Sequence, residues 1–269
     1  YYDGMYDELQ YSSTAWDADW IQTNYNNQNA PSSFVTIGAT ATPVNCGCEV
    51  TYQYHKEFVF QAAQVSGGSP LVDFTALIAV TDPDLRNVAN GGNVQNINGY
   101  DIQFRESGGA TALNYQIEKY VPTTGELVAW VKIPTLSNAT NTTIEMHYGN
   151  ASVGCNPSSS GTWNGNYEAV WHLAQDPSSD AQEDATATGA DGTSAGGMTS
   201  TNLIPGQIGD AIDFDGTDDY LSLSSIGYTA AGEIPQLTVA AWVNTRFVDA
   251  GYNSNWAILD FDRSEYFNV

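Results

Sequence analysis

Four aspartates stand close together in the second half of the chain: Asp213, Asp215, Asp218 and Asp219. Calcium prefers several oxygen ligands, and a turn in this stretch could bring these carboxylates together with backbone carbonyls. The sequence therefore predicts a structural calcium (Ca2+) site here. The alternative is that Asp-Gly and Asp-Asp simply form turns on an acidic surface.

The three cysteines, Cys46, Cys48 and Cys155, make a poor zinc set, because a closed structural site takes four nitrogen or sulfur ligands. Cys46-Gly47-Cys48 is also not a CxxC redox motif. We expect one disulfide between Cys155 and either Cys46 or Cys48, formed in an oxidising compartment. Free thiols are the alternative.

The remaining candidates for catalysis are weak. His55, His147 and His172 each lie in or beside an expected strand, and none is part of a nucleophile or metalloprotease motif such as GxSxG or HExxH. Paired carboxylates could hydrolyse glycosides, but 31 acidic residues make chance pairs unavoidable. The sequence predicts that this chain is not an enzyme.

The charge balance excludes one class of partner. The chain has 31 acidic and 7 basic residues, for a net charge of −24. Nucleic-acid binding needs clustered Lys and Arg, so we expect no nucleic-acid partner. The acidity could serve calcium binding, with Asp82 and Asp84 as a second candidate pair, or form a solvated surface suited to a secreted protein. No apolar run approaches the roughly 20 residues of a membrane span.

The elements that must position these residues are strands. Between residues 51 and 152, short runs with apolar residues at every second position alternate with Gly-containing turns, which predicts an antiparallel β-sandwich. The strands are expected at Glu57–Ala63, Leu71–Val80, Asp101–Arg105, Tyr115–Val121, Glu126–Ile133 and Thr143–Tyr148.

A polar linker separates this module from a second one. Residues 153–166 are mostly Gly, Asn, Ser, Thr and Pro, which supply turns but little apolar area. Strand-like sequence resumes at Tyr167, and the second module is expected over residues 167–269. In it, Ile212 and Phe214 point inward while the neighbouring aspartates share the outer face. The fold class is therefore all-β, with two antiparallel β-sandwich modules in tandem.

Residues 1–50 form a Tyr- and Asn-rich N-terminal extension that we assign to no family. Its aromatic residues, such as Trp16 and Trp20, could make a platform for sugars. Aromatic residues more often pack as an anchor on a neighbouring module, and we favour that interpretation.

The first module resembles a known family. The runs DFTALIAVTDPDL (Asp73–Leu85), GYDIQF (Gly99–Phe104), YQIEKY (Tyr115–Tyr120), GELVAWVKIPTLS (Gly125–Ser137) and IEMHYGN (Ile144–Asn150) are similar to a bacterial domain family of unknown function. The resemblance covers about Tyr52–Ser152. In secreted and surface proteins that family commonly precedes a LamG-type, concanavalin A-like domain, including in a protein associated with MSHA-type pili. The resemblance implies no known catalytic residues.

The second module resembles the first half of that neighbouring domain. YEAVWHL (Tyr167–Leu173), GQIGDAIDFDGTDDYLSL (Gly206–Leu223) and LTVAAWVNT (Leu237–Thr245) are similar to a LamG-type jelly roll, a family that binds glycans, proteins or calcium in other proteins. The resemblance implies a partial concanavalin A-like jelly roll, because a full member would continue for several strands beyond Val269. We expect further residues or another chain to complete this sandwich.

These observations together lead to one expected function. We expect a non-catalytic, secreted or cell-surface bacterial segment for adhesion or carbohydrate binding, with a glycan or a surface protein as its partner. The alternatives are an accessory region of a secreted polysaccharide-degrading enzyme and a structural subunit of a surface fibre. The resemblance, and not any catalytic chemistry, supports this function.

Overall fold

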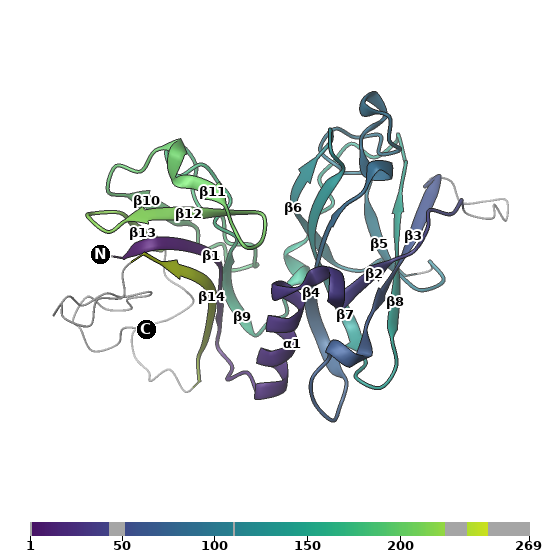
Figure 1. The fold of residues 1–269 in the computed structure, drawn as a ribbon, viewed down its shortest axis with the longest axis horizontal. Coiled ribbons are helices and arrows are strands. Elements are labelled where there is room, and N and C mark those ends of the chain that lie inside the picture. The colour runs from purple at the N-terminus through teal and green to yellow at the C-terminus, as the bar shows by residue number, and fades with distance from the viewer. Residues whose placement is uncertain (1, 43–51, 110, 224–235, 247–269) are drawn as a thin grey trace. The chain divides into compact units, whose positions relative to one another are not determined.

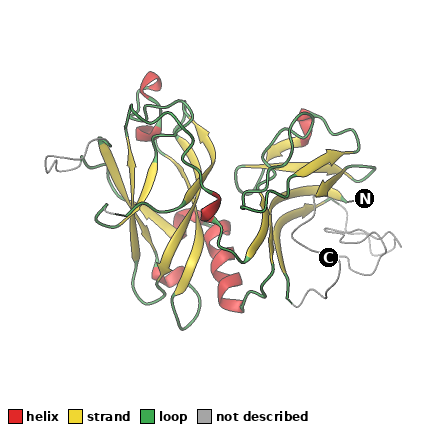
Figure 2. Ribbon diagram, turned by 180° about the vertical axis from the view of Figure 1, so that it is seen from behind, coloured by secondary structure: helices red, strands yellow, loops and turns green. Residues whose placement is uncertain are grey.

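The computed structural model describes residues 2–42, 52–109, 111–223 and 236–246. The chain forms two compact units, one of residues 16–164 and one of residues 1–15 and 165–269. Within the described residues, the strands of both units pair in antiparallel ladders, which confirms the predicted all-β class (Figure 1). The described residues also include two α-helices and five 3-10 helices of three residues each, drawn red in Figure 2.

Two sheets build the unit of residues 16–164, in the strand orders β2–β3–β8–β5 and β4–β7–β6. Phe58 and Phe104 from the first sheet and Phe74 and Val131 from the second lie in one buried apolar cluster, so the sheets enclose a common core. The first sheet comprises β2 (Val35–Ile37), β3 (Tyr54–Phe60), β8 (Thr142–Tyr148) and β5 (Gln103–Glu106), and the second comprises β4 (Leu71–Thr81), β7 (Glu126–Leu136) and β6 (Tyr115–Val121).

All six strands expected between residues 51 and 152 are present, with ends that differ by a few residues. The alternation that predicted them is visible in β8, where Ile144, Met146 and Tyr148 are buried and the intervening residues are not. A buried core face fixes the strand register, because a slip of one residue would turn these side chains outward.

Helix α1 (Ala18–Asn29) covers the exposed edge of β4 and is followed by the short helix α2 (Pro31–Phe34). The amide of Asn27 donates to the Leu77 carbonyl at 3.0 Å and accepts from the Leu77 N–H at 2.7 Å. Because β4 ends its sheet, this side chain satisfies backbone groups that an edge strand leaves unpaired. Trp20 packs against Phe74 with ring centroids 5.1 Å apart, so it acts as a packing anchor.

The second unit is built around strand β1 (Asp3–Ser12), which the sequence analysis placed in an extension. β1 pairs with β12 and β9 on one side and with β14 on the other. Its partners lie more than 150 residues away along the chain. The unit's other strands are β9 (Tyr167–Trp171), β10 (Gly192–Ala195), β11 (Leu203–Pro205), β12 (Asp210–Asp215), β13 (Tyr220–Leu223) and β14 (Thr238–Thr245), with β10 and β13 forming a separate two-stranded sheet.

A β-bulge interrupts β1. The register with β14 shifts between Asp7 and Gln10, and Glu8 has a φ of 53°, which is unusual for a residue other than glycine. Tyr6 before the bulge and Leu9 after it both belong to the same buried apolar cluster. The bulge therefore keeps apolar side chains on one face although their sequence spacing changes.

The two units divide the chain differently from the predicted ranges 1–50, 51–152, 153–166 and 167–269. Residues 1–15 join the later part of the chain, because β1 pairs with β9, β12 and β14. The predicted linker contributes to the earlier unit, where Trp163 packs on Trp130 at 5.3 Å and the Thr162 carbonyl accepts a hydrogen bond from Thr75. Among the described residues, no helix has the length and apolar character needed to cross a membrane.

Candidate functional site

The predicted calcium residues lie on and beside the turn between β12 and β13. Asp215, Asp218 and Asp219 each place a carboxylate oxygen within 4.8 Å of the others, so these three could hold a cation together. Asp213 is engaged elsewhere, because its carboxylate forms an ion pair with Arg246, which also contacts Asp3 at 2.7 Å. The structure thus brings together three of the four predicted ligands.

Local hydrogen bonds organise this turn. Asp215 accepts from the Thr217 N–H at 2.7 Å, and this bond is the main reason that the pKa of Asp215 lies below its ordinary value. Asp219 is buried and accepts from the Asp215 N–H at 3.1 Å. Burial raises the pKa of Asp219, and the charges of Asp215 and Asp218 raise it further. A bound cation would relieve this repulsion. The same hydrogen bonds also fit the alternative, in which these residues only form a turn.

A second candidate lies on one sheet of the unit of residues 16–164. The outward-pointing residues of β3, β8 and β5, with the residue two positions before β3, form a surface that we call the β3–β8–β5 face: Tyr52, His55, Arg105, Glu145 and His147. They share a face because strand residues alternate and because His55 lies opposite His147 and Arg105 opposite Glu145 in the ladders. All five are partly accessible to solvent.

The side chains of this face contact one another closely. The rings of His55 and His147 are stacked with centroids 5.5 Å apart, and Tyr52 meets His147 edge-on at 6.1 Å. The Arg105 guanidinium lies 5.8 Å from the centre of the Tyr52 ring, within the range of a cation–π interaction. The face therefore combines aromatic rings with groups that donate and accept hydrogen bonds.

Glu145 orients His147 and the adjacent loop. Its Oε2 lies 2.8 Å from His147 Nε2, and its Oε1 accepts from the Gly108 N–H at 2.8 Å. Burial lowers the pKa of His147 below its ordinary value, and the hydrogen bond to Glu145 opposes this shift only in part. The lowered pKa favours the neutral imidazole, which can act as one donor and one acceptor.

The Asp82–Asp84 pair, the lesser calcium candidate, instead holds a lysine. Lys56 on β3 is buried, and its Nζ forms ion pairs with Asp82 and, at 3.0 Å, with Asp84. Burial alone lowers the pKa of Lys56, but the hydrogen bonds to the two aspartates outweigh burial and raise it. Hydrogen bonds from Thr40 and Lys56 lower the pKa of Asp84. The Lys56 ammonium group therefore occupies the position between Asp82 and Asp84 that the sequence suggested for a calcium ion.

Two further buried carboxylates have structural roles that the sequence analysis missed. Asp101 and Asp184 each accept hydrogen bonds mainly from backbone N–H groups, most of which belong to loop residues, and these bonds fix the course of the loops. The donors to Asp101 are the N–H groups of Gln95, Asn96, Gly149 and Asn150; those to Asp184 are the N–H groups of Val170, Thr186 and Ala190 and the Thr186 hydroxyl. A lone Asp in the sequence carries no signal for this role.

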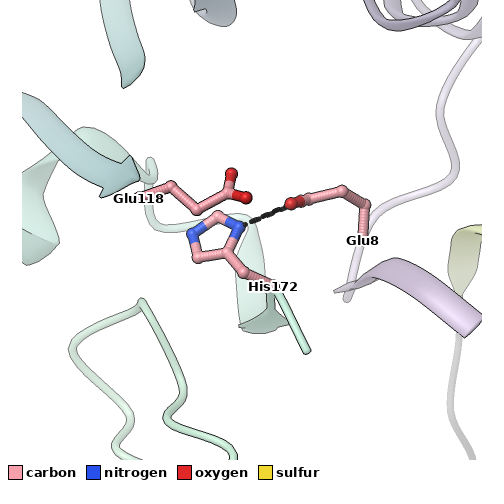
Figure 3. Close-up of side chains that lie close together, drawn as sticks. All are labelled: Glu8, Glu118 and His172. Atoms are coloured by element: carbon pink, nitrogen blue, oxygen red, sulfur yellow. Dashed lines mark hydrogen bonds and ion pairs between the residues drawn. The ribbon is translucent and has the colours of Figure 1, made fainter. Parts of the chain in front are cut away.

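His172 and Glu8 form a buried pair in the unit of β1. His172 Nδ1 lies 2.8 Å from Glu8 Oε1, as the dashed line in Figure 3 marks. Glu8 has the positive φ of the β1 bulge, and Leu173, directly after His172, has a φ of 58°. Unusual backbone conformations of this kind persist where the surrounding structure holds them. The pair ties β1 to the end of β9.

The predicted disulfide stays a prediction. Cys155 is exposed, and Cys46 and Cys48 lie outside the described residues.

Part of the chain is similar to a known family. Residues 98–189 match the model of a family described as "Domain of unknown function (DUF2341)". This match supports a domain of unknown function in that part of the chain and agrees with the resemblance inferred from its motifs, although the match begins and ends later in the sequence. Searches of curated proteins and of solved structures gave no match.

Proposed function

We propose that this chain is a non-catalytic segment of a secreted or cell-surface bacterial protein and that it binds carbohydrate in adhesion. The observation that carries the proposal is the β3–β8–β5 face, where the Tyr52 ring lies beside Arg105, Glu145 and His147. Sugars present flat C–H faces that pack on aromatic rings, and their hydroxyls need donors and acceptors nearby.

Two further observations support a role in binding. The net charge of −24 disfavours polyanionic partners, so a neutral glycan fits better than a nucleic acid. Two buried carboxylates that could suggest catalysis have structural roles instead, because Asp101 and Asp184 accept hydrogen bonds from backbone N–H groups. The resemblance of the later part of the chain to LamG-type, concanavalin A-like domains is consistent with adhesion.

A glycan array probed with the labelled chain tests this proposal. We expect retention of a neutral glycan, and the variant Tyr52→Ala should weaken binding about two- to twelvefold, because losing one aromatic contact costs about 0.5–1.5 kcal/mol. Tyr25→Ala is the matched control, since Tyr25 is half exposed on α1 and lies outside the face. Equal binding by all three proteins, or no retention of any glycan, would contradict the proposal.

The two alternatives differ in what surrounds this segment. An accessory region of a polysaccharide-degrading enzyme requires a hydrolase domain in the same protein, whereas a fibre subunit, including one in a pilus context, requires repeats or an anchoring signal. The sequence of the full-length gene separates them.

Structural calcium binding at Asp215, Asp218 and Asp219 is a second proposal, favoured by the convergence of their oxygens. We expect calcium to raise the melting temperature of the chain and a chelator to reverse the gain, because an ion that binds only the folded state stabilises it. Asp218→Asn should remove most of the gain. Asp180→Asn, an exposed aspartate outside the turn, is the control and should leave the gain intact. An unchanged melting temperature with calcium would leave turn formation as the only role of these residues.

A further inference from the structure

The contact between Lys56 and Asp82 joins the two sheets of the unit of residues 16–164. Lys56 lies on β3 of one sheet, and Asp82 follows directly after β4 of the other. The Lys56 side chain is 5% exposed, and the Asp82 side chain is 18% exposed. The amine and the carboxyl group are therefore held together where little water reaches them.

The surroundings fix the Asp82 carboxyl group. Its Oδ1 accepts from the Asp84 N–H at 2.9 Å, and the Asp82 N–H donates to the Gly125 carbonyl at 3.1 Å. Its Oδ2 is the atom that contacts Lys56 Nζ. The amine thus meets a carboxyl group that is held in place, with a backbone donor on the oxygen away from the amine.

A second carboxylate lies on the same amine. Asp84 Oδ2 is 3.0 Å from Lys56 Nζ and accepts from the Thr40 hydroxyl at 2.5 Å, and Thr40 in turn lies 3.0 Å from the Tyr148 hydroxyl. A carboxylate in this position can accept a proton from nitrogen and return it to a departing oxygen.

We propose that Lys56 and Asp82 form an intramolecular isopeptide bond, with Asp84 as the proton relay. The inference is independent of the proposed carbohydrate binding. The bond between Lys56 and Asp82 would join the two sheets covalently.

The reaction needs no external reagent. It begins when a proton moves from the Lys56 ammonium to Asp82, which turns the ion pair into a neutral amine and a carboxylic acid. Nζ then attacks Cγ of Asp82, and the negative charge that develops on Oδ1 is stabilised by the Asp84 N–H. Asp84 takes a proton from nitrogen and gives it to the hydroxyl group that leaves as water. One N–C bond forms, one C–O bond breaks, and one water molecule is released.

Two physical effects favour the amide over the ion pair. Fixed neighbours react with a high effective concentration, because the entropy of bringing them together is already lost on folding. The amide also replaces two poorly hydrated charges by a neutral group, which removes much of the desolvation cost of a buried ion pair.

Intact mass spectrometry of the full chain, reduced and denatured, tests the proposal. We expect a mass lower than that of the sequence by one water molecule. Trypsin should then fail to cleave after Lys56, and the peptide that contains Lys56 should be joined to the one that contains Asp82.

Variants separate the cross-link from an ion pair. Lys56→Arg keeps the positive charge but cannot form this amide, so it should have its full sequence mass. Asp84→Asn keeps the contact of Lys56 with Asp82 and should have a strongly reduced cross-linked fraction. Lys119→Arg is the control, because Lys119 forms a more exposed ion pair with Glu126, and it should keep the loss of water. A wild-type chain with its full sequence mass and normal cleavage after Lys56 would overturn the proposal. Full cross-linking in Asp84→Asn would overturn the role of Asp84.

Discussion

At the residue scale, aspartate side chains have different roles in different surroundings. Asp101, fully buried, receives four backbone N–H groups, whereas Asp215, exposed in a turn, receives N–H groups from its own neighbours. The sequence predicted the cluster of acidic residues in the β12–β13 turn, because proximity in sequence ensured proximity in space. It could not predict that Arg246 forms an ion pair with Asp213 or that Lys56 forms ion pairs with Asp82 and Asp84, since those partners are distant along the chain.

Asp101→Asn should destabilise the protein. In the variant, an NH2 group replaces one of the two accepting oxygens and cannot accept hydrogen bonds, so buried backbone N–H groups lose their partner. We expect this loss to lower the free energy of unfolding by about 2–4 kcal/mol. Urea unfolding measures the difference. Glu106→Gln, at an exposed position on β5, is the control and should change the value by less than about 0.5 kcal/mol. A loss at Asp101 no larger than at Glu106 would show that the loop bonds contribute little.

His147 should make stability depend on pH. Its pKa is lower in the folded chain than its ordinary value of 6.5, because burial disfavours the charged ring. The unfolded chain therefore binds more protons, so the contribution is fully present above that value and is lost as the pH falls through it towards the folded pKa. Urea unfolding between about pH 8 and pH 5 should show this fall, and His147→Gln should flatten it. An identical pH profile in the variant would assign the effect to other groups.

At the element scale, alternation in sequence predicted strands well wherever a strand is regular. β8 shows why: its buried residues recur at every second position without a break. β1 was missed because its bulge shifts this phase, so that buried Tyr2 and Tyr6 are followed by buried Leu9 and Tyr11. A pattern that changes from even to odd positions does not resemble a single strand. Its pairing with β12 and β14 also joins segments that no local pattern connects.

Asn27→Ala should destabilise the edge of β4. The variant loses both hydrogen bonds between Asn27 and the backbone N–H and carbonyl groups of Leu77. We expect this loss to lower the free energy of unfolding by about 1–3 kcal/mol. Thermal unfolding measures the effect as a lower melting temperature. Asn29→Ala, exposed at the end of the same helix, is the matched control. Equal melting temperatures for the two variants would refute a special role of Asn27.

At the scale of the whole molecule, composition and turn chemistry predicted an all-β chain, and the domain of unknown function agrees with its motifs. The division into units could not be predicted, because residues 1–15 join a distant part of the chain through strand pairing rather than through sequence proximity. The proposed ligand surface, the β3–β8–β5 face, could not be predicted from the sequence either. Its five residues come from three separate segments between Tyr52 and His147, and the pairing of β3, β8 and β5 brings them together.

The most direct test of carbohydrate binding is an amide NMR titration of the full chain with the glycan that the array retains. We predict that the shifts with added glycan centre on Tyr52, His55, Arg105, Glu145 and His147, and that Tyr52→Ala weakens them. Shifts that leave this face unchanged, or that centre on the turn between β12 and β13, would contradict the proposed site.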